Sequence, residues 1–377
     1  MTTLEKPDFS ALLDDNYLVD ALKKLEINEP TEVQALSIPP ALENKDLIVQ
    51  AQTGSGKTLA FMLPILKRIR TEKPARGTTA LIVCPTRELA LQVKRVVDSI
   101  SPDITPACII GGASSREQEQ QLRKDSRIVV GTPGRIIDFI QQRLIILRNC
   151  RTFVLDEADE MLSMGFVDEV RNILRSLPPE RQGLFFSATI SGNVAALASS
   201  FLRSPKTIVV AKNEENKPDI EHMFCKVEMG VTSKAQALSK LLADSGAQSA
   251  IVFCNTKSDT ELVEVFLKRR GFDAAKINSD LSQKERDKVL SSLRNGTLKY
   301  LIATDVAARG IDIKELDLVI NYSLPKENEV YTHRTGRTGR AGASGKAISV
   351  ISPLDLPTFR SLNHHRGEEM KEIFLAA

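Results

Sequence analysis

The stretch Asp46-Leu-Ile-Val-Gln-Ala-Gln-Thr-Gly-Ser-Gly-Lys-Thr58 runs from an apolar segment into a loop with two glycines. An amphipathic segment, Leu59 to Leu66, follows directly. Residues 46–50 are mainly apolar, which is typical of a strand buried on both faces of a parallel sheet. A strand, a glycine-containing loop and a helix in this order predict an α/β fold.

The same alternation of short β-branched runs and longer helical segments continues along the chain. Up to residue 210 it predicts further strands at 80–84, 107–110, 127–130, 152–156, 183–187 and 207–210. After the polar, proline-ended stretch 211–218 it predicts strands at 250–254, 273–276, 300–304, 318–321 and 347–351. We therefore expect two α/β domains, residues 1–210 and 219–377, joined by a linker at 211–218.

The composition is that of an ordinary globular chain. Of 377 residues, 42% are hydrophobic and 26% are charged, a balance too apolar for a disordered chain. Lys and Arg total 51 against 48 Asp and Glu, so the net charge is +3 and neither predicted domain is strongly basic. A site for a polyanion would therefore have to be local.

The five cysteines, at positions 84, 108, 150, 225 and 254, include no C-x-x-C pair and no histidine at metal-ligand spacing. This pattern argues against disulfides and structural zinc and favours a reducing compartment. The N-terminus lacks the basic and apolar regions of a signal peptide, and no run of about 18 apolar residues occurs. We therefore expect a cytoplasmic protein without a membrane span.

The glycine loop after residues 46–50 has the order that a phosphate-binding loop needs. Backbone N–H groups of the loop and the helix N-terminus bind phosphates, Lys57 reaches the β and γ groups, and the Thr58 hydroxyl binds Mg²⁺. Ala51 stands where the usual pattern has its first glycine. The alternative, a chance glycine-rich turn, is disfavoured because a strand and a helix flank the loop.

A second group of polar residues, Asp156-Glu-Ala-Asp159, follows the apolar run Phe153-Val-Leu155. An acid at the carboxyl end of a buried parallel strand lies at the edge where such sheets bind ligands. With a phosphate loop in the same domain, Asp156 is predicted to hold Mg²⁺ through its hydration shell and Glu157 to orient the attacking water. Taken alone, the tetrapeptide also fits a helix N-terminus capped by Asp156.

Arginines recur at every third position in Tyr331-Thr-His-Arg-Thr-Gly-Arg-Thr-Gly-Arg340. The segment is too polar for a core helix, and by itself it would also fit a solvated basic loop. Phosphoryl transfer needs a cation at the transition state, and the phosphate loop lies in the other domain. We therefore predict that Arg337 and Arg340 are arginine fingers that complete the site when the domains close.

Together these motifs resemble those of the DEAD-box ATP-dependent RNA helicases of superfamily 2, and the resemblance covers nearly the whole chain. Beyond the namesake Asp156–Asp159, the family's other motifs are matched in order at 85–90, 111–112, 132–135, 187–189, 251–256, 283–286, 303–312 and 333–342. The resemblance implies two RecA-like domains, each a mostly parallel sheet flanked by helices, joined by a flexible linker.

The resemblance also implies a nucleotide site. Gln34, in Pro30-Thr-Glu-Val-Gln34, matches the residue that reads the adenine edge, and Phe9 matches an isolated upstream aromatic. Ile27 stands where the family usually stacks an aromatic ring on the base, so adenine should be held by apolar contact instead. The implied ATP-binding residues are Phe9, Gln34, Gln52, Thr53, Gly54, Ser55, Gly56, Lys57, Thr58, Gly310 and Asp312.

RNA contacts and coupling residues are implied in the same way. Ser187 and Thr189 match the motif that couples hydrolysis to RNA binding, with a strand-end cap as an alternative role, and His333 should orient the interdomain face. Contacts to phosphate and sugar bind RNA without reading its sequence, and the 2′-OH permits a preference for RNA over DNA. The implied RNA-binding residues are Arg87, Gly112, Thr132, Arg135, Asn255, Arg286 and Thr304.

The sequence thus predicts an RNA-stimulated ATPase that uses ATP and Mg²⁺ to separate short RNA duplexes or to remodel RNA–protein complexes. Two alternatives stay open at this point: a DNA helicase or translocase on the same fold, and an RNA clamp or scaffold that uses ATP only to lock on. The expected partners are RNA and ribonucleoprotein, RNA-decay or ribosome-assembly complexes. We expect a monomeric core and no membrane association.

Overall fold

The computed structural model describes residues 7–52, 54–72, 77–124, 126–210, 219–278, 280–308, 316–339, 344–366 and 369–375, without the side chains at 231, 283, 329, 365 and 366. The chain divides into two compact units, Met1–Lys212 and Asn213–Ala377. The predicted linker at 211–218 lies outside the described residues, so its bounds stay a prediction.

A seven-stranded sheet forms the centre of the first unit. Its strands pair in the order β3-β4-β2-β5-β6-β1-β7, and every pair is parallel. Strands β2, β4 and β5 are buried along their whole length because helices cover both faces. The strands are β1 (Leu47–Gln50), β2 (Ala80–Val83), β3 (Ala107–Ile109), β4 (Ile128–Gly131), β5 (Thr152–Leu155), β6 (Gln182–Ser187) and β7 (Lys206–Val209).

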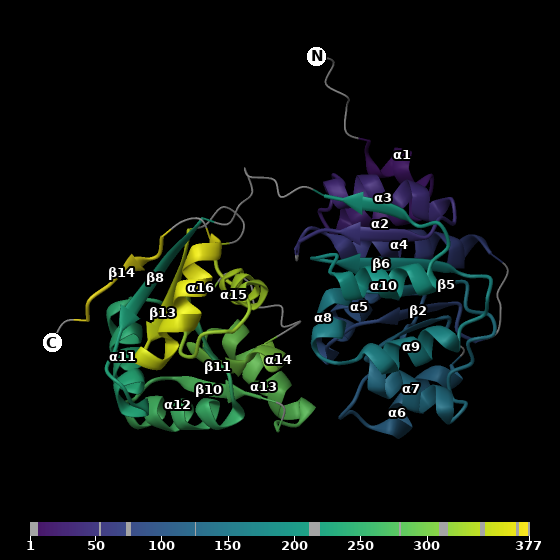
Figure 1. The fold of residues 1–377 in the computed structure, drawn as a ribbon. Coiled ribbons are helices and arrows are strands. Elements are labelled where there is room, and N and C mark those ends of the chain that lie inside the picture. The colour runs from purple at the N-terminus through teal and green to yellow at the C-terminus, as the bar shows by residue number, and fades with distance from the viewer. Residues whose placement is uncertain are drawn as a thin grey trace, which may run out of the picture. The chain divides into compact units, whose positions relative to one another are not determined.

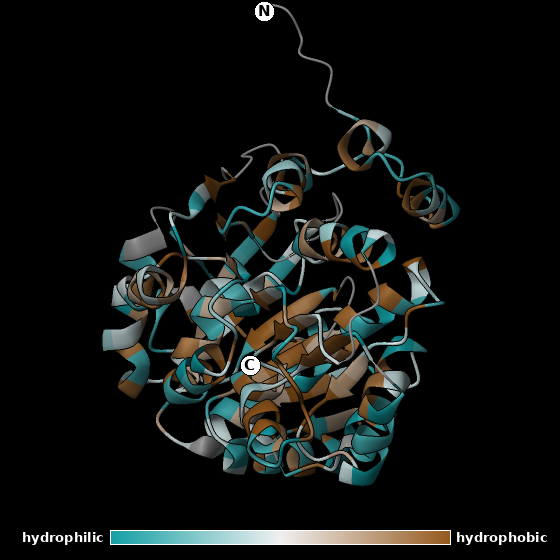
Figure 2. Cartoon of the chain, turned by 90° about the vertical axis from the view of Figure 1, so that its right-hand side faces the viewer, coloured by the Kyte–Doolittle hydropathy of each residue, from teal (hydrophilic) through white to brown (hydrophobic). Residues whose placement is uncertain are grey.

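The helices of the first unit pack on the two faces of this sheet (Figure 1). Neighbouring strand residues point to opposite faces, so Phe186 packs in the core with α1–α5 and Phe185 in the core with α7–α10. Figure 2 shows these hydrophobic strands enclosed by helices that carry hydrophilic residues. The helices are α1 (Phe9–Leu13), α2 (Asn16–Lys24), α3 (Glu32–Leu42), α4 (Lys57–Thr71), α5 (Arg87–Ile100), α6 (Ser115–Arg123), α7 (Pro133–Gln141), α8 (Ala158–Ser163), α9 (Val167–Arg175) and α10 (Gly192–Phe201).

The second unit is built around another seven-stranded parallel sheet, in the order β10-β11-β9-β12-β13-β8-β14. Its strands are β8 (Ile220–Lys226), β9 (Ala250–Cys254), β10 (Ala274–Ile277), β11 (Tyr300–Thr304), β12 (Leu318–Asn321), β13 (Gly345–Ile351) and β14 (Lys371–Glu372). Its helices are α11 (Val231–Asp244), α12 (Lys257–Arg269), α13 (Gln283–Arg294), α14 (Asp305–Ala308), α15 (Asn328–Thr335) and α16 (Leu356–Arg366), with a 3₁₀ turn η2 at Pro353–Asp355.

The two units have the same topology. When the strands of each unit are numbered from its first strand, both sheets have the order 3-4-2-5-6-1-7. In both, the first strand lies near one edge and the chain crosses to the far part of the sheet and back. The carboxyl ends of equivalent strands therefore occupy equivalent places in the two units.

All twelve strands predicted from the sequence are present, and their ends agree within two residues. The α/β prediction is therefore confirmed. Strands β8 and β14 were not predicted. The polar residues Glu221 and His222 follow Ile220 at the start of β8, and this half of the strand is not fully buried, so β8 lacks a continuous apolar run. β14 has two residues, Lys371 and Glu372, which are in a strand only because they pair with β8.

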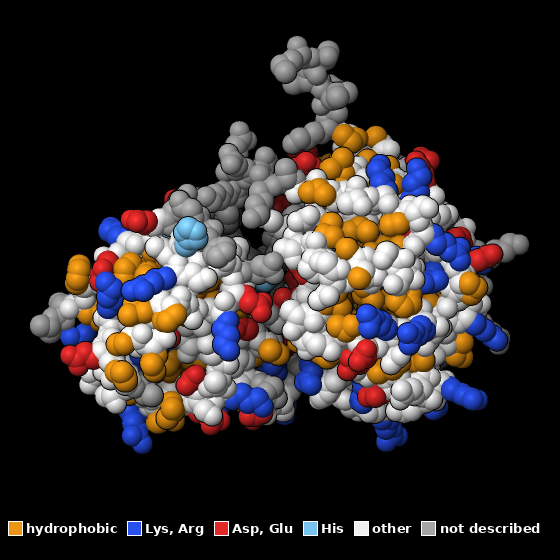
Figure 3. All heavy atoms as spheres, in the orientation of Figure 1, with side chains coloured by type: hydrophobic (Ala, Val, Ile, Leu, Met, Phe, Trp, Pro, Cys, Tyr) orange, Lys and Arg blue, Asp and Glu red, His pale blue; other side chains and the backbone are white. Residues whose placement is uncertain are grey.

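The surface carries both signs of charge, and the visible face of each unit shows Lys or Arg interspersed with Asp or Glu (Figure 3). None of the helices in the described part of the chain is long and apolar enough to cross a membrane. All five cysteines are buried as free thiols. Burial raises the pKa of the thiols of Cys108 and Cys150 to about 12, so both are protonated at neutral pH.

Candidate active site

Three neighbouring strands of the first unit end at one edge of the sheet, and each end carries candidate residues. The strand order β5-β6-β1 is parallel, so the loops that follow these strands lie side by side. The phosphate loop follows β1, Ser187 ends β6, and Asp156 follows β5. The carboxyl edge of a parallel sheet is where α/β proteins bind ligands.

The phosphate loop turns on two glycines in the left-handed region, Gly54 at φ 84° and Gly56 at φ 94°. Gly56 caps α4, and Lys57 is the first residue of that helix. The Lys57 side chain is 6% exposed, and its Nζ donates to the Ala51 carbonyl oxygen at 2.9 Å. Thr58 lies in the first turn of α4, and the predicted Thr53 lies outside the described residues. The loop thus presents a helix N-terminus beside a buried cation, which suits an anion.

Two further residues that were predicted to bind phosphate fix the start of the loop. The Ser55 hydroxyl donates to the Gln52 carbonyl oxygen at 2.7 Å. This bond closes a tight turn just before Gly56, so Gln52 and Ser55 shape the loop through their backbone as much as through their side chains.

Gln34 lies against the phosphate loop. Its Oε1 accepts from the Thr31 N–H at 3.0 Å and its Nε2 donates to the Gly56 carbonyl oxygen at 3.1 Å. The side chain is 2% exposed, and a Cβ at Gly56 would lie only 2.5 Å from its Nε2. A primary amide has two donor hydrogens and two acceptor lone pairs, so one of each is left for a ligand after these bonds.

The other residues of the predicted base site have different surroundings. Phe9 is 3% exposed and packs in the hydrophobic core with α1–α5. Ile27 is half-buried and packs against the same core. Phe9 therefore packs inside the unit, where it supports the segment that carries Gln34.

Asp156 is a buried carboxyl at the end of β5. It is 2% exposed, and burial, together with the charge of Glu157, raises its pKa to about 7 while nearby Lys57 opposes the rise. Its Oδ1 accepts from the Glu157 N–H at 3.1 Å. Glu157 has φ 53° and is the residue that precedes α8, so the alternative of a helix capped by Asp156 is wrong. A non-glycine residue in this region is uncommon and marks a constrained loop.

Asp159 joins the end of β5 to the end of β6. Its Oδ2 accepts from the Thr189 N–H at 2.8 Å and from the Thr189 hydroxyl at 2.9 Å. Its own N–H donates to the Ser187 hydroxyl at 3.1 Å, and that hydroxyl donates to the Thr189 carbonyl oxygen at 2.7 Å. These hydrogen bonds therefore tie the loop after β5 to the loop after β6. The sequence pointed to Ser187 and Thr189 but did not assign Asp159 this role.

In the second unit, Arg334 of α15 forms a buried network that the sequence analysis missed. The side chain is 1% exposed, and its guanidinium donates to both carboxylate oxygens of Asp305 at 2.6 and 2.7 Å. Its remaining N–H groups donate to oxygens that come from the ends of β9 and β12: Asn255 at 2.9 Å, Asn321 at 3.2 Å and Ser323 at 2.6 Å. All five donors are thus used.

The predicted arginine fingers fall partly within the described residues. Arg337 follows α15, is half-buried and shares a small cavity with His333, Arg334 and Asp305. Arg340, Gly310 and Asp312 lie outside the described residues. The sequence analysis assigned a role to Arg337 and Arg340 and none to Arg334, whose guanidinium is saturated by its own unit.

The RNA-binding candidates of the first unit gather at one place. A Cβ at Gly112 would lie 2.3 Å from Arg87 Nη1, so the guanidinium packs directly on this glycine. Arg135 donates to the Ala113 carbonyl oxygen at 3.3 Å, and Thr132 precedes α7, which carries Arg135. The fold thus brings together an arginine of α5, a glycine of the loop that follows β3, and an arginine of α7.

The candidates of the second unit are more deeply embedded. Arg286 is 7% exposed and donates to the carbonyl oxygens of Asn278 at 3.4 Å and Ala307 at 3.2 Å. Asn255 donates to the Leu324 carbonyl oxygen at 2.8 Å and accepts from Arg334, and Thr304 is half-buried at the end of β11. Arg286 and Asn255 therefore also hold the loops at this edge of the sheet together.

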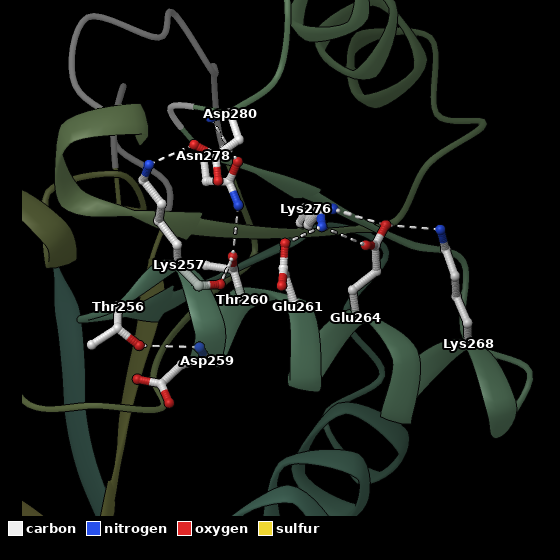
Figure 4. Close-up of polar contacts among 10 residues, drawn as sticks. All are labelled: Thr256, Lys257, Asp259, Thr260, Glu261, Glu264, Lys268, Lys276, Asn278 and Asp280. Carbon is white, nitrogen blue, oxygen red and sulfur yellow. Dashed lines mark hydrogen bonds and ion pairs between the residues drawn. The ribbon is translucent and has the colours of Figure 1, made fainter.

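A row of polar contacts fixes α12 against the edge strand β10 beside these loops (Figure 4). Asn278 Nδ2 donates to the Thr260 hydroxyl at 3.2 Å, and Lys276 Nζ lies 2.9 Å from a Glu261 carboxylate oxygen. Lys257 Nζ lies 2.5 Å from an Asp280 carboxylate oxygen. The backbone around Asn278, which accepts from Arg286, is therefore held from two sides.

Comparison with known proteins agrees with this arrangement. Residues 31–197 match the family DEAD/DEAH box helicase, and residues 233–342 match the family helicase conserved C-terminal domain. The chain is 41% identical over 367 residues to the ATP-dependent RNA helicase CshA of Listeria monocytogenes, an alignment that spans 97% of this chain and 70% of that protein. It is 40% identical to the ATP-dependent RNA helicase DbpA of Bacillus subtilis, over 94% of this chain and 74% of that protein.

Solved structures extend the likeness to the fold. S. cerevisiae Dbp5 bound to RNA and ADP BeF3 superposes with a TM-score of 0.85 at 31% identity, over 95% of this chain and 93% of that one. Two RecA-like units with these motifs define the class of superfamily 2 helicases. Within that class, the chain belongs to the DEAD-box ATP-dependent RNA helicases, so it is an ATPase that binds ATP and RNA.

Proposed function

We propose that the ends of β1, β5 and β6 form the hydrolytic half of the ATP site. The observation that carries this proposal is the adjacency of the phosphate loop, Asp156 and Ser187 on three neighbouring parallel strands. Gly54 to Thr58 would bind the phosphates through backbone N–H groups, with Lys57 exchanging its bond to Ala51 for one to a phosphate oxygen. Gln34 would read the adenine edge with the donor and acceptor that it has left.

Thr58 and Asp156 would hold Mg²⁺. The donor set fits, because a hydroxyl and a carboxylate are the hard oxygen ligands that Mg²⁺ takes together with water and phosphate oxygens. When bound, the ion neutralises charge that develops on the phosphate oxygens. Binding would also keep the buried Asp156 carboxyl ionised, against the rise in its pKa. Glu157, held in its constrained backbone conformation, would orient the water that attacks the γ-phosphate.

The cations at the transition state would come from the second unit. Arg337 and Arg340 are the proposed arginine fingers, Gly310 and Asp312 the proposed further ATP contacts, and His333 the residue that orients this face. Arg334 is not among them, because its guanidinium is fully used within the unit. We propose that closure of the two units on ATP and RNA completes the site, so the two ligands bind cooperatively.

RNA would be held along its backbone by two clusters of residues. Arg87, Gly112, Thr132 and Arg135 form the first, and Asn255, Arg286 and Thr304 the second. These groups would contact phosphates and sugars, so the proposed activity is separation of short duplexes and remodelling of RNA–protein complexes without sequence readout. The Asp159 contacts to Ser187 and Thr189 would couple hydrolysis to RNA binding. Ribonucleoprotein complexes are the proposed partners.

The substitution Glu157→Gln tests the hydrolytic assignment. Gln keeps the shape but not the charge of the side chain, so we expect RNA-stimulated ATP hydrolysis to fall by about 10²- to 10³-fold while ATP and RNA still bind. The measurement is phosphate release with RNA and with DNA of the same sequence, alongside RNA affinity in the presence of a non-hydrolysable ATP analogue.

The matched control is Asp168→Asn, an exposed carboxylate in α9 of the same unit, which should leave hydrolysis unchanged. Hydrolysis by Glu157→Gln at the rate of the parent protein would show that another group orients the water. Equal stimulation by RNA and DNA would contradict the proposed use of the 2′-OH.

A further inference from the structure

Tyr331 is the large apolar residue that anchors α15, the helix that precedes the proposed finger Arg337. Its side chain is 1% exposed and packs with Phe224, Phe359 and Met370 in a separate core of the second unit. A buried phenol hydroxyl needs a hydrogen-bond partner, because an unsatisfied one loses its solvation without compensation.

The hydroxyl of Tyr331 has that partner on β8. It lies 3.0 Å from His222 Nδ1, and the two rings are 5.8 Å apart between centroids. His222 and Phe224 are two residues apart on the strand, so both face the core that holds Tyr331. Met370 directly precedes β14, and its Sδ atom lies 3.8 Å from the same hydroxyl. The phenol is therefore held by β8 and by the segment leading into β14.

Tyr331 and Arg334 are three residues apart and so lie on one face of α15. Arg334 ties this face to Asp305 and to the ends of β9 and β12. Tyr331 ties it to β8. Two anchors at different places in the sheet fix both the rotation and the tilt of the helix, and the side chains that follow α15 inherit that orientation.

We infer that Tyr331 and His222 are a positioning pair for ATP hydrolysis, which orients α15 and thereby Arg337. The inference rests on the proposed role of Arg337 as an arginine finger. Neither residue touches the reacting atoms. The pair acts because a finger that is misplaced by a small tilt of its helix loses much of its contribution to the transition state.

The test compares Tyr331→Phe with two substitutions at 222 by steady-state kinetics of the full chain with saturating RNA. Tyr331→Phe keeps the ring and removes the hydroxyl with its contacts to His222 and Met370, so we expect kcat to fall about fivefold and KM for ATP to change less than about twofold. His222→Leu should give the same loss. His222→Gln should retain kcat, because an amide can both donate to and accept from the hydroxyl. The double variant Tyr331→Phe with His222→Leu should lose no more than either single variant.

Two controls separate the possible failures. Tyr322→Phe, at a buried tyrosine directly after β12 of the same unit, should leave kcat unchanged. Arg337→Ala should remove most of the hydrolysis, and if it does not, the proposed finger is wrong and this inference falls with it. If Arg337→Ala loses hydrolysis while Tyr331→Phe keeps the parent kcat, only the positioning role is overturned. Equal losses in His222→Gln and His222→Leu would also overturn it.

Discussion

The two units share one strand order, yet the ends of equivalent strands carry different chemistry. In the first unit, the phosphate loop follows the first strand, Asp156 follows the fifth, and Ser187 ends the sixth. In the second, Val227 follows the equivalent strand β8, Tyr322 follows β12, and Ile351 ends β13. The scaffold positions loops in both units, and the loop residues alone decide which unit can hold ATP.

A buried cation in each unit shows the same contrast more sharply. Lys57 is 6% exposed and donates to a loop carbonyl oxygen, a contact that a phosphate oxygen can replace. Arg334 is 1% exposed, and its five donors are all used by a carboxylate, two side-chain amides and a carbonyl. Burial of a charge therefore does not identify a ligand site. What identifies it is how many hydrogen-bond donors of the cation the protein itself already uses.

Arg334→Ala tests most directly whether the two buried cations differ in this way. Removing one partner of a buried ion pair leaves the Asp305 carboxylate without its cation, so we expect the second unit to lose about 3–5 kcal/mol of unfolding free energy. Urea unfolding followed by tyrosine fluorescence measures it, because Tyr300, Tyr322 and Tyr331, three of the four tyrosines, lie in this unit. Arg337→Ala, in the next turn, is the control and should change stability by less than about 1 kcal/mol. Equal stability of Arg334→Ala and the parent would remove the distinction.

Lys57→Ala tests the other side of the comparison. Loss of the phosphate-binding charge should lower ATP hydrolysis by about 10²- to 10³-fold, equivalent to about 3–4 kcal/mol. The free energy of unfolding should stay within about 1 kcal/mol of the parent, because the bond to Ala51 is a single contact of an amine. Phosphate release and urea unfolding on the same sample give both values. A large loss of stability would make Lys57 part of the framework, like Arg334.

Gln34→Ala gives the smallest expected effect. A hydrogen-bonding site rejects the wrong base edge by leaving its own polar groups unpaired, so the preference for ATP over GTP should weaken by about 1–3 kcal/mol. Nucleotide competition for a labelled ATP analogue measures the preference. Thr31→Ala is the matched control, since it removes the hydroxyl that caps the backbone N–H of Gln34 but keeps the Thr31 N–H that donates to the Gln34 amide. An equal loss of preference in Thr31→Ala would assign the effect to loop geometry and not to base reading.

The sequence predicted most strands because buried parallel strands are continuous apolar runs, a signal that is local. It could not predict β14, whose two residues depend on pairing with a strand from the start of the unit. The phosphate loop and Asp156 were predictable for a related reason, because their spacing is local and the chemistry demands those residue types. The burial of these residues and their hydrogen bonds could not be predicted from the sequence.

The network around Arg334 was out of reach for the opposite reason. Its partners Asn255, Asp305 and Asn321 are spread over three strands, and only the strand order β11-β9-β12 brings them together. The three-residue spacing of the arginines does not show which of them the fold uses internally. A signal for this network was Asp305, an acid that directly follows the buried strand β11, as Asp156 directly follows β5.

The pairing of β14 with β8 has a consequence for synthesis on the ribosome. The first strand of the second unit is made early and gains its outer neighbour only when residues 371–372 emerge, which at about 5–20 residues per second is on the order of ten seconds later. Until then, one edge of β8 is open to pairing with other chains. Met370, which touches the Tyr331 hydroxyl, arrives at the same time. The unit thus completes its sheet and the core around α15 in one late step.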